Sequence, residues 1–161
     1  MTDEQQSRTA TDHARVKFPP PLLFLLLIMF GWLLQQWIPL AIHLPIAIRV
    51  GGGAIAAAGL VFLLSSAGLF RRHQTAIEPW RPSSALVTEG IYAWTRNPIY
   101  LGFCMITAGL GIATSNLWTV LAVVPGAAGV YLIAIAKEEA YLEREFGEEY
   151  LVYKNRVRRW L

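Results

Sequence analysis

The chain has 161 residues, of which 55% are hydrophobic and only 16% are charged. A soluble domain is typically about 45–50% apolar and about 25% charged, so this composition excludes a disordered chain, a charged nucleic-acid-binding module and most soluble enzymes. The lone cysteine, Cys104, excludes an internal disulfide framework and a cysteine-based metal site. The charged residues fall outside four long apolar stretches. The pattern therefore predicts an integral membrane protein whose surroundings are the lipid bilayer, with no nucleic-acid partner.

The four apolar stretches predict membrane-spanning helices at residues 22–42, 46–70, 99–114 and 117–136. A helix needs roughly 17–25 residues to cross the hydrocarbon, and the third stretch reaches this length only if it begins within the headgroup layer. A polar leader, residues 1–21, precedes a single membrane domain, residues 22–161. The expected fold class is all-α: a polytopic membrane protein with four transmembrane helices and a C-terminal amphipathic interfacial helical segment.

The basic residues predict the orientation of these helices. Three Lys or Arg residues precede the first span, four lie between the second and third, and six follow the fourth. The connections on the other side contain none, and only Arg49 lies near that face. Because Lys and Arg concentrate in cytoplasmic loops, we expect a multi-pass protein with both termini in the cytoplasm, in the cytoplasmic membrane if the cell is bacterial.

Small residues inside the second span resemble a nucleotide-binding pattern. The hexapeptide from Gly51 to Ala56 fits G-x-G-x-x-A, but it lies within an apolar helix and no strand precedes it. Close packing of membrane helices is the better interpretation, since small residues let helix backbones approach each other. Gly126 and Gly129 are predicted to serve the same purpose. No metal site is predicted, because His43 and His73 each stand alone.

A cytoplasmic loop, residues 71–98, joins the second and third spans. At its end, Asn97 and Pro98 predict a helix start, since Asn is a strong N-cap and Pro is favoured at the first helical position. Such a start presents backbone N–H groups that suit an anion, although a plain capped helix explains the local sequence equally simply. Glu138 follows Pro98 by 40 residues. At about 1.5 Å per residue, one helix out and one back return Glu138 and Glu139 to the depth of Tyr100.

The cytoplasmic tail, residues 137–161, carries an apolar stripe. Its members recur every three or four residues and share one helical face: Leu142, Phe146, Tyr150, Tyr153, Val157 and Trp160. Gly147 is predicted to divide this segment into two helices. We expect it to lie on the membrane surface, where it either covers the loop and the paired carboxylates or only anchors the chain.

Four segments carry a resemblance to a known family. They are Leu86-Val87-Thr88-Glu89-Gly90-Ile91-Tyr92, Arg96-Asn97-Pro98-Ile99-Tyr100-Leu101-Gly102, Glu138-Glu139-Ala140-Tyr141-Leu142 and Phe146-Gly147-Glu148-Glu149-Tyr150. In this order and at this spacing they resemble the isoprenylcysteine carboxyl methyltransferase family, whose relatives include membrane phospholipid methyltransferases. The resemblance covers roughly residues 70–160.

The resemblance implies S-adenosylmethionine as the cofactor, bound on the cytoplasmic side, and a lipophilic or lipid-borne acceptor that arrives from the bilayer. It places cofactor contacts on Ser84, Ala85, Leu86, Val87, Tyr92, Asn97, Pro98, Ile99, Tyr100 and Glu138. The residues themselves are compatible with this assignment, because helix-start N–H groups suit a carboxylate and Glu138 suits an ammonium group or ribose hydroxyls. Glu138 and Glu139 are the candidate catalytic residues, as general bases for a neutral acceptor.

Two positions depart from the family pattern. Asn97 stands where the family usually has histidine, and asparagine cannot exchange a proton. Ala134 stands where the prenylcysteine enzymes have an arginine that meets the substrate carboxylate. The sequence therefore favours a less anionic or smaller acceptor, such as an amine, a thiol or a lipid headgroup. Two other functions stay open: an NADPH-dependent reductase of the sterol-reductase type, and a membrane scaffold without enzymatic activity.

Overall fold

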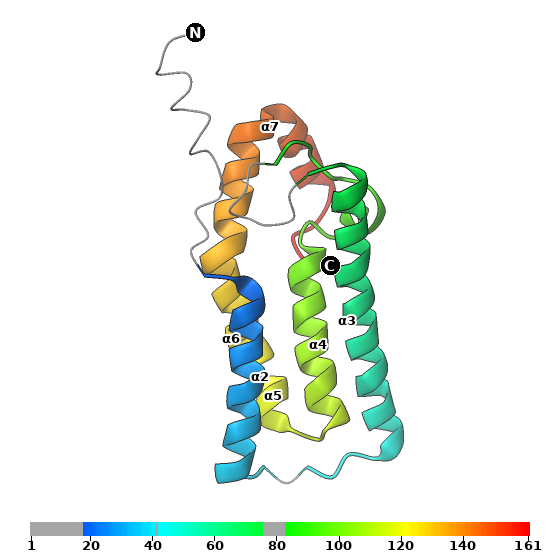
Figure 1. The fold of residues 1–161 in the computed structure, drawn as a ribbon, viewed down its shortest axis with the longest axis vertical. Coiled ribbons are helices and arrows are strands. Elements are labelled where there is room, and N and C mark those ends of the chain that lie inside the picture. The colour runs from blue at the N-terminus through cyan, green and yellow to red at the C-terminus, as the bar shows by residue number, and fades with distance from the viewer. Residues whose placement is uncertain (1–17, 41, 76–82) are drawn as a thin grey trace.

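A computed structural model describes residues 18–40, 42–75 and 83–161, and every regular element in these ranges is helical. Two long helices, α2 (Pro20–Trp37) and α3 (Ile46–Arg72), precede the short 3-10 helix η1 (Gly90–Ala93) and helix α4 (Pro98–Ala113). The last helical run consists of α5 (Leu117–Leu121), α6 (Val123–Val130), the π-helical turn η2 (Tyr131–Ile135) and α7 (Ala136–Arg156). The elements form an elongated bundle (Figure 1), which confirms the all-α prediction. Most of the predicted leader and part of the cytoplasmic loop lie outside the described residues.

Three helical runs are long and apolar enough to cross a membrane: α2, α3 and the run that begins at Leu117. These correspond to the first, second and fourth predicted spans. Helix α2 ends at Trp37, five residues before the predicted boundary, because Pro39 follows and the residue before a proline disfavours helical geometry. Helix α4 is a shorter apolar helix of 16 residues, so the count of four spans stays a prediction.

Helices α3 and α4 lie side by side (Figure 1) and pack through glycine. A Cβ atom at Gly109 would lie 2.5 Å from the backbone nitrogen of Ala56 and 2.6 Å from the carbonyl oxygen of Gly52. A Cβ atom at Gly59 would lie 2.6 Å from the carbonyl oxygen of Gly102. Gly51, by contrast, has open space around its Cβ position. The glycine-rich hexapeptide is therefore a helix-packing element, as the sequence predicts.

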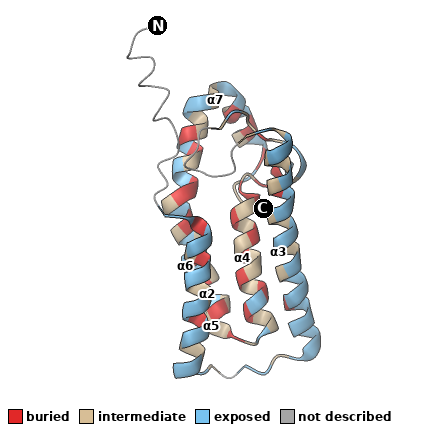
Figure 2. Cartoon of the chain, in the orientation of Figure 1, coloured by how far each residue is buried: buried red, intermediate tan, exposed pale blue. Residues whose placement is uncertain are grey.

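Buried residues concentrate along α4 and on the inner sides of its neighbours, while the outer faces of α2 and α3 are exposed (Figure 2). Only 17% of the most apolar window of α2, and 11% of that of α3, is buried inside the protein. Large apolar side chains such as Trp32 and Leu64 therefore lie on the outside. Because water would not solvate such a surface, it fits a lipid environment.

Helix α7 bends sharply at Gly147, whose backbone has φ 49° and ψ −123°. This conformation lies in the positive-φ region that glycine tolerates best, and it confirms the predicted break in the tail. After the bend, the chain folds back so that the C-terminus lies beside the start of α4 (Figure 1). Tyr150, Tyr153 and Val157 are buried there, packed against Leu86 of the loop. Of the two alternatives for the apolar stripe, these contacts support the one in which it covers the loop.

Candidate functional site

The site begins where α4 meets α7. The Tyr100 hydroxyl, in the first turn of α4, donates a hydrogen bond to Glu138 Oε1, in the first turn of α7. This contact confirms that the helices out and back return the paired carboxylates to the level of the α4 start. Tyr100 is 6% exposed, and burial raises the pKa of the Glu138 carboxyl, so this contact is largely removed from solvent.

Tyr92, in η1, completes this cluster from the loop side. Burial raises its pKa far above the ordinary value for tyrosine, and the nearby Glu138 charge adds to the rise, whereas a hydrogen bond with Ser66 opposes it. The Tyr92 ring contacts Phe70 of α3, with ring centroids 5.7 Å apart. Two aromatic rings and one carboxylate, Tyr92, Tyr100 and Glu138, therefore come together from three elements. Such a set suits a cationic or hydroxyl-bearing ligand.

The loop segment that the resemblance assigns to the cofactor is held by contacts with α7 and with the residues after α3. The backbone nitrogen of Ser83 donates to the Tyr141 hydroxyl of α7 at 3.0 Å. Ser84 bonds in the other direction, with its nitrogen 3.0 Å from Oγ1 of Thr75, three residues after the end of α3. Leu86 packs against the buried tail residues, and Val87 is 6% exposed. The segment thus bridges α7 and the residues that follow α3.

Asn97 occupies the N-cap position of α4 and Pro98 the first turn, as predicted, but the Asn97 side chain does not cap the helix. Instead, its Nδ2 donates to the carbonyl oxygen of Arg159 at 3.0 Å. The predicted position of the helix start is confirmed, but the prediction that the Asn97 side chain caps the helix is wrong. The returning tail places the Arg159 carbonyl oxygen, which also accepts from Thr95 Oγ1, where it holds the Asn97 amide, and local sequence gives no sign of it.

Glu139 differs from its neighbour Glu138, because two arginines engage its carboxylate. Arg159 donates to both oxygens, with Nε 2.9 Å from Oε1 and Nη2 2.8 Å from Oε2. Arg96 Nη1 lies 3.2 Å from Oε1. The hydrogen bond to Glu139 raises the pKa of Arg159 above its ordinary value. The side chains of Arg96 and Glu139 are 9% and 11% exposed, whereas that of Arg159 is 37% exposed, so the ion triad is buried at Arg96 and reaches solvent at Arg159.

The residues after α7, 157–161, form a strap across the start of α4. Backbone and side-chain bonds fix it: the Arg96 nitrogen donates to the Arg158 carbonyl at 2.9 Å, and Thr95 Oγ1 donates to the Arg159 carbonyl at 3.1 Å. Trp160 packs against the core cluster that contains Tyr100. The strap therefore holds the tail over the candidate site.

Of the predicted cofactor-binding residues, the structure brings Tyr92, Tyr100 and Glu138 together in one cluster. Ile99 packs against the core and Ala134 is fully buried in it. Sequence reasoning did not single out Arg96 or Arg159, because their partner lies 43 and 20 positions away and no periodicity links them. In the described ranges, no group of three His, Cys, Asp or Glu side chains is placed to hold a metal ion.

Residues 47–149 match the family model of the phospholipid methyltransferases. The chain belongs to this family. It is also similar to protein-S-isoprenylcysteine O-methyltransferases, which confirms the resemblance noted in the sequence. The Mus musculus protein is 36% identical over 80 residues, covering 45% of this chain and 25% of that protein. The Schizosaccharomyces pombe protein is 36% identical over 72 residues, covering 45% and 30%.

An uncharacterized protein from Haemophilus influenzae is 38% identical over 63 residues, which is 39% of this chain and 100% of that protein. The chain matches only about a quarter to a third of the length of the isoprenylcysteine relatives. No solved structure matches it significantly. The region matched by the family model, residues 47–149, contains nearly all of α3, the whole of α4, and both Glu138 and Glu139.

Proposed function

We propose that this protein is an integral membrane methyltransferase that uses S-adenosylmethionine and modifies a small lipophilic or lipid-borne acceptor by in-line methyl transfer. The observation that carries the proposal is the contact between Tyr100 and Glu138. It joins two of the segments by which the chain resembles a family whose named members are O-methyltransferases. In this proposal all four apolar helices span the membrane and both termini are cytoplasmic. Labelling of a cysteine placed at the exposed Leu161 from the cytoplasmic side alone tests that orientation.

The side chains at this site fit the cofactor's chemistry. Glu138 offers a negative charge for an ammonium group or an acceptor for ribose hydroxyls. Tyr92 and Tyr100 offer aromatic faces for a cation, and the backbone N–H groups in the first turn of α4 suit a carboxylate. Further contacts are assigned to Ser84, Ala85, Leu86, Val87, Asn97, Pro98 and Ile99. When bound, S-adenosylmethionine supplies a methyl group on a positively charged sulfur, which is already electrophilic.

The protein's own contribution is then to align the acceptor and exclude water. The strap and the buried tail residues lie over the start of α4, where they shield the site from the cytoplasm. For a neutral acceptor, Glu138 is the candidate general base. Glu139 is tied to Arg96 and Arg159, so we assign it a positioning role: it holds the strap and fixes the first turn of α7.

The acceptor is proposed to lack a carboxylate like that of prenylcysteine. Ala134, which replaces the arginine of the prenylcysteine enzymes, is 0% exposed and lies in an apolar cluster. A methyl side chain there offers no positive charge to a carboxylate. An amine, a thiol or a lipid headgroup is therefore the expected acceptor. Methylation of farnesylated cysteine at a rate equal to that of the best amine or thiol would contradict this assignment.

Thermal unfolding of the detergent-purified protein tests the class of cofactor. A ligand that binds only the folded state raises the melting temperature once its concentration exceeds its dissociation constant. We expect S-adenosylmethionine and S-adenosylhomocysteine to raise it and NADPH to leave it unchanged. A rise with NADPH alone would instead support the reductase. No rise with any of the three in folded protein would support a scaffold.

A further inference from the structure

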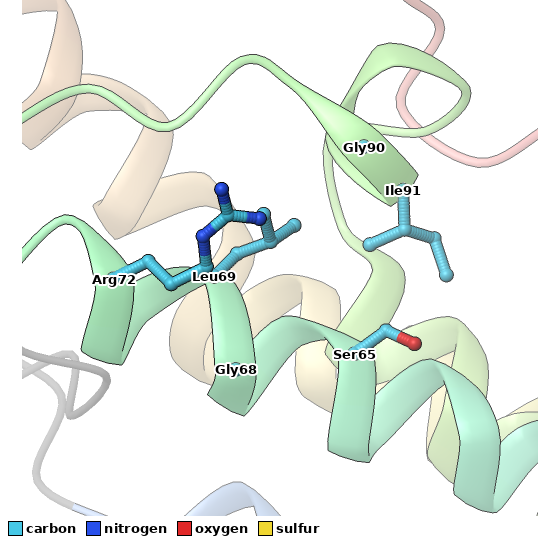
Figure 3. A pocket seen from close by; sticks show the side chains of 6 residues that line it. All are labelled: Ser65, Gly68, Leu69, Arg72, Gly90 and Ile91. Atoms are coloured by element: carbon cyan, nitrogen blue, oxygen red, sulfur yellow. The ribbon is translucent and has the colours of Figure 1, made fainter.

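A groove lies on the outside of the bundle, where the end of α3 meets η1 (Figure 3). Its volume is about 360 Å³. One wall is a single face of the last two turns of α3, formed by residues three or four apart: Ser65, Gly68, Leu69 and Arg72. Gly90 and Ile91 of η1 form the other wall. The groove shares no residue with the Tyr92, Tyr100 and Glu138 cluster, which is formed by η1, α4 and α7.

Two glycines shape this groove in different ways. Gly90 has φ +59°, a backbone conformation that glycine tolerates best, and a Cβ atom there would lie 3.0 Å from Leu69 Cδ1, so η1 packs closely on the Leu69 side chain of α3. Gly68 has no atom within 4 Å of its Cβ position. The absence of a side chain at Gly68 therefore leaves the space that the groove occupies.

The chemistry of the groove changes along α3. Leu69 and Ile91 make it apolar, and Arg72 stands at its end, at the last residue of the helix (Figure 3). Arg72 is exposed and forms no ion pair within the described part of the chain, and the same holds for Arg71. Glu89, the nearest acidic residue in sequence to the η1 wall, is hydrogen-bonded to His73 at 3.0 Å. Arg71 and Arg72 outnumber this one carboxylate, so the described residues at the end of the groove carry a net positive charge.

We propose that this groove binds an anionic glycerophospholipid, with its phosphate on Arg72 and an acyl chain along Gly68 and Leu69. Helix α3 is long and apolar enough to span the bilayer, and its outer face is largely uncovered by protein. Its basic end then lies at the level of lipid phosphates, where Lys and Arg attract anionic headgroups. An amphiphile with an anionic headgroup matches an apolar groove that ends in a cation. This binding does not depend on methyl transfer.

Native mass spectrometry of the full-length, detergent-purified protein tests the proposal by titration with phosphatidylglycerol or phosphatidylcholine. The wild type is expected to prefer phosphatidylglycerol. Arg72→Gln should weaken phosphatidylglycerol binding about fivefold, the effect of one basic residue near an anionic surface, and should leave phosphatidylcholine unchanged. The matched control is Arg71→Gln, which removes the same charge at the same depth outside the groove. Equal weakening by both variants would show nonspecific attraction and overturn the site.

A second pair of variants tests the groove itself. Gly68→Leu fills the space without meeting any atom within 4 Å of the new Cβ, and should reduce binding of both lipids at least tenfold. Gly53→Leu adds the same side chain to the same helix, also into open space, and should bind like the wild type. Melting temperatures close to the wild-type value show that both variants fold. Lipid binding by Gly68→Leu equal to that by Gly53→Leu, or no lipid binding by the wild type, would overturn the proposal.

Discussion

The two adjacent glutamates are expected to respond differently to the same substitution: Glu139→Gln should lower the unfolding free energy, and Glu138→Gln should lower the affinity for the cofactor. Glu139 accepts from Arg159 at 2.9 and 2.8 Å and from Arg96 at 3.2 Å. Gln at this position keeps one acceptor oxygen, places an NH₂ group against a guanidinium and leaves two arginines without their counter-charge. Breaking a buried ion pair costs about 3–5 kcal/mol. Taking the lower end, since Arg159 is 37% exposed, we expect Glu139→Gln to lose about 3 kcal/mol of unfolding free energy.

Glu138→Gln is the matched comparison. Its amide oxygen still accepts from the Tyr100 hydroxyl, so the loss of unfolding free energy should stay below about 1 kcal/mol. It removes the charge proposed to meet the cofactor, and hydrogen bonds to charged groups contribute about 1.5–3 kcal/mol. Cofactor affinity should therefore fall at least about tenfold.

Thermal unfolding and cofactor titration in one detergent measure both effects. A loss of about 3 kcal/mol corresponds to a drop in melting temperature of about 6–12 °C for a chain of this size. The reasoning is refuted if Glu139→Gln melts like the wild type, or if Glu138→Gln loses as much stability as Glu139→Gln and binds the cofactor unchanged. Either result would mean that the two carboxylates do not divide structure and binding as their contacts indicate.

Three further predictions concern the strap, the helix pair and the cofactor contact. Arg159→Gln removes the bidentate partner of Glu139 but leaves Arg96, so it should lower the unfolding free energy by about 1–2 kcal/mol, less than Glu139→Gln. It should also speed cofactor dissociation, and a stopped-flow release rate equal to that of the wild type would contradict the covering role of the strap. Gly109→Leu should prevent packing of α4 on α3, because its Cβ would lie 2.5 Å from backbone, whereas Gly51→Leu should fold normally; size-exclusion profiles of the two that match would contradict this. Tyr100→Phe removes the donor to Glu138 and should change cofactor affinity with little loss of melting temperature; a large loss of stability with unchanged affinity argues for a structural role.

Chain length and hydrophobic pattern were sufficient to predict where the main helices lie along the chain. The return of Glu138 to Tyr100 follows from the helical rise and from the number of residues between Pro98 and Glu138. The break at Gly147 followed from one residue type within a periodic stripe. These features depend on local rules, and local rules can be applied to a single sequence.

The bonding of the site depends on tertiary contacts that no local rule predicts. Asn97 bonds to the Arg159 carbonyl and not to its own helix because the chain turns back after Gly147. For the same reason Glu139 carries an ion triad and Glu138 does not. Adjacent residues on one helix point about 100° apart, so identical neighbours face different surroundings. The sequence could place both glutamates at the site, but only the three-dimensional contacts distinguish their roles.

The measurement that tests the central claim most directly is calorimetric binding of S-adenosylhomocysteine to the wild type, Glu138→Gln and Glu145→Gln. Glu145 is an exposed glutamate on the same helix, and Glu145→Gln removes the same charge at a position away from the site. The account predicts binding by the wild type and Glu145→Gln with equal affinity, and at least about tenfold weaker binding by Glu138→Gln. Equal affinity in all three proteins, or no binding by the folded wild type, would contradict it.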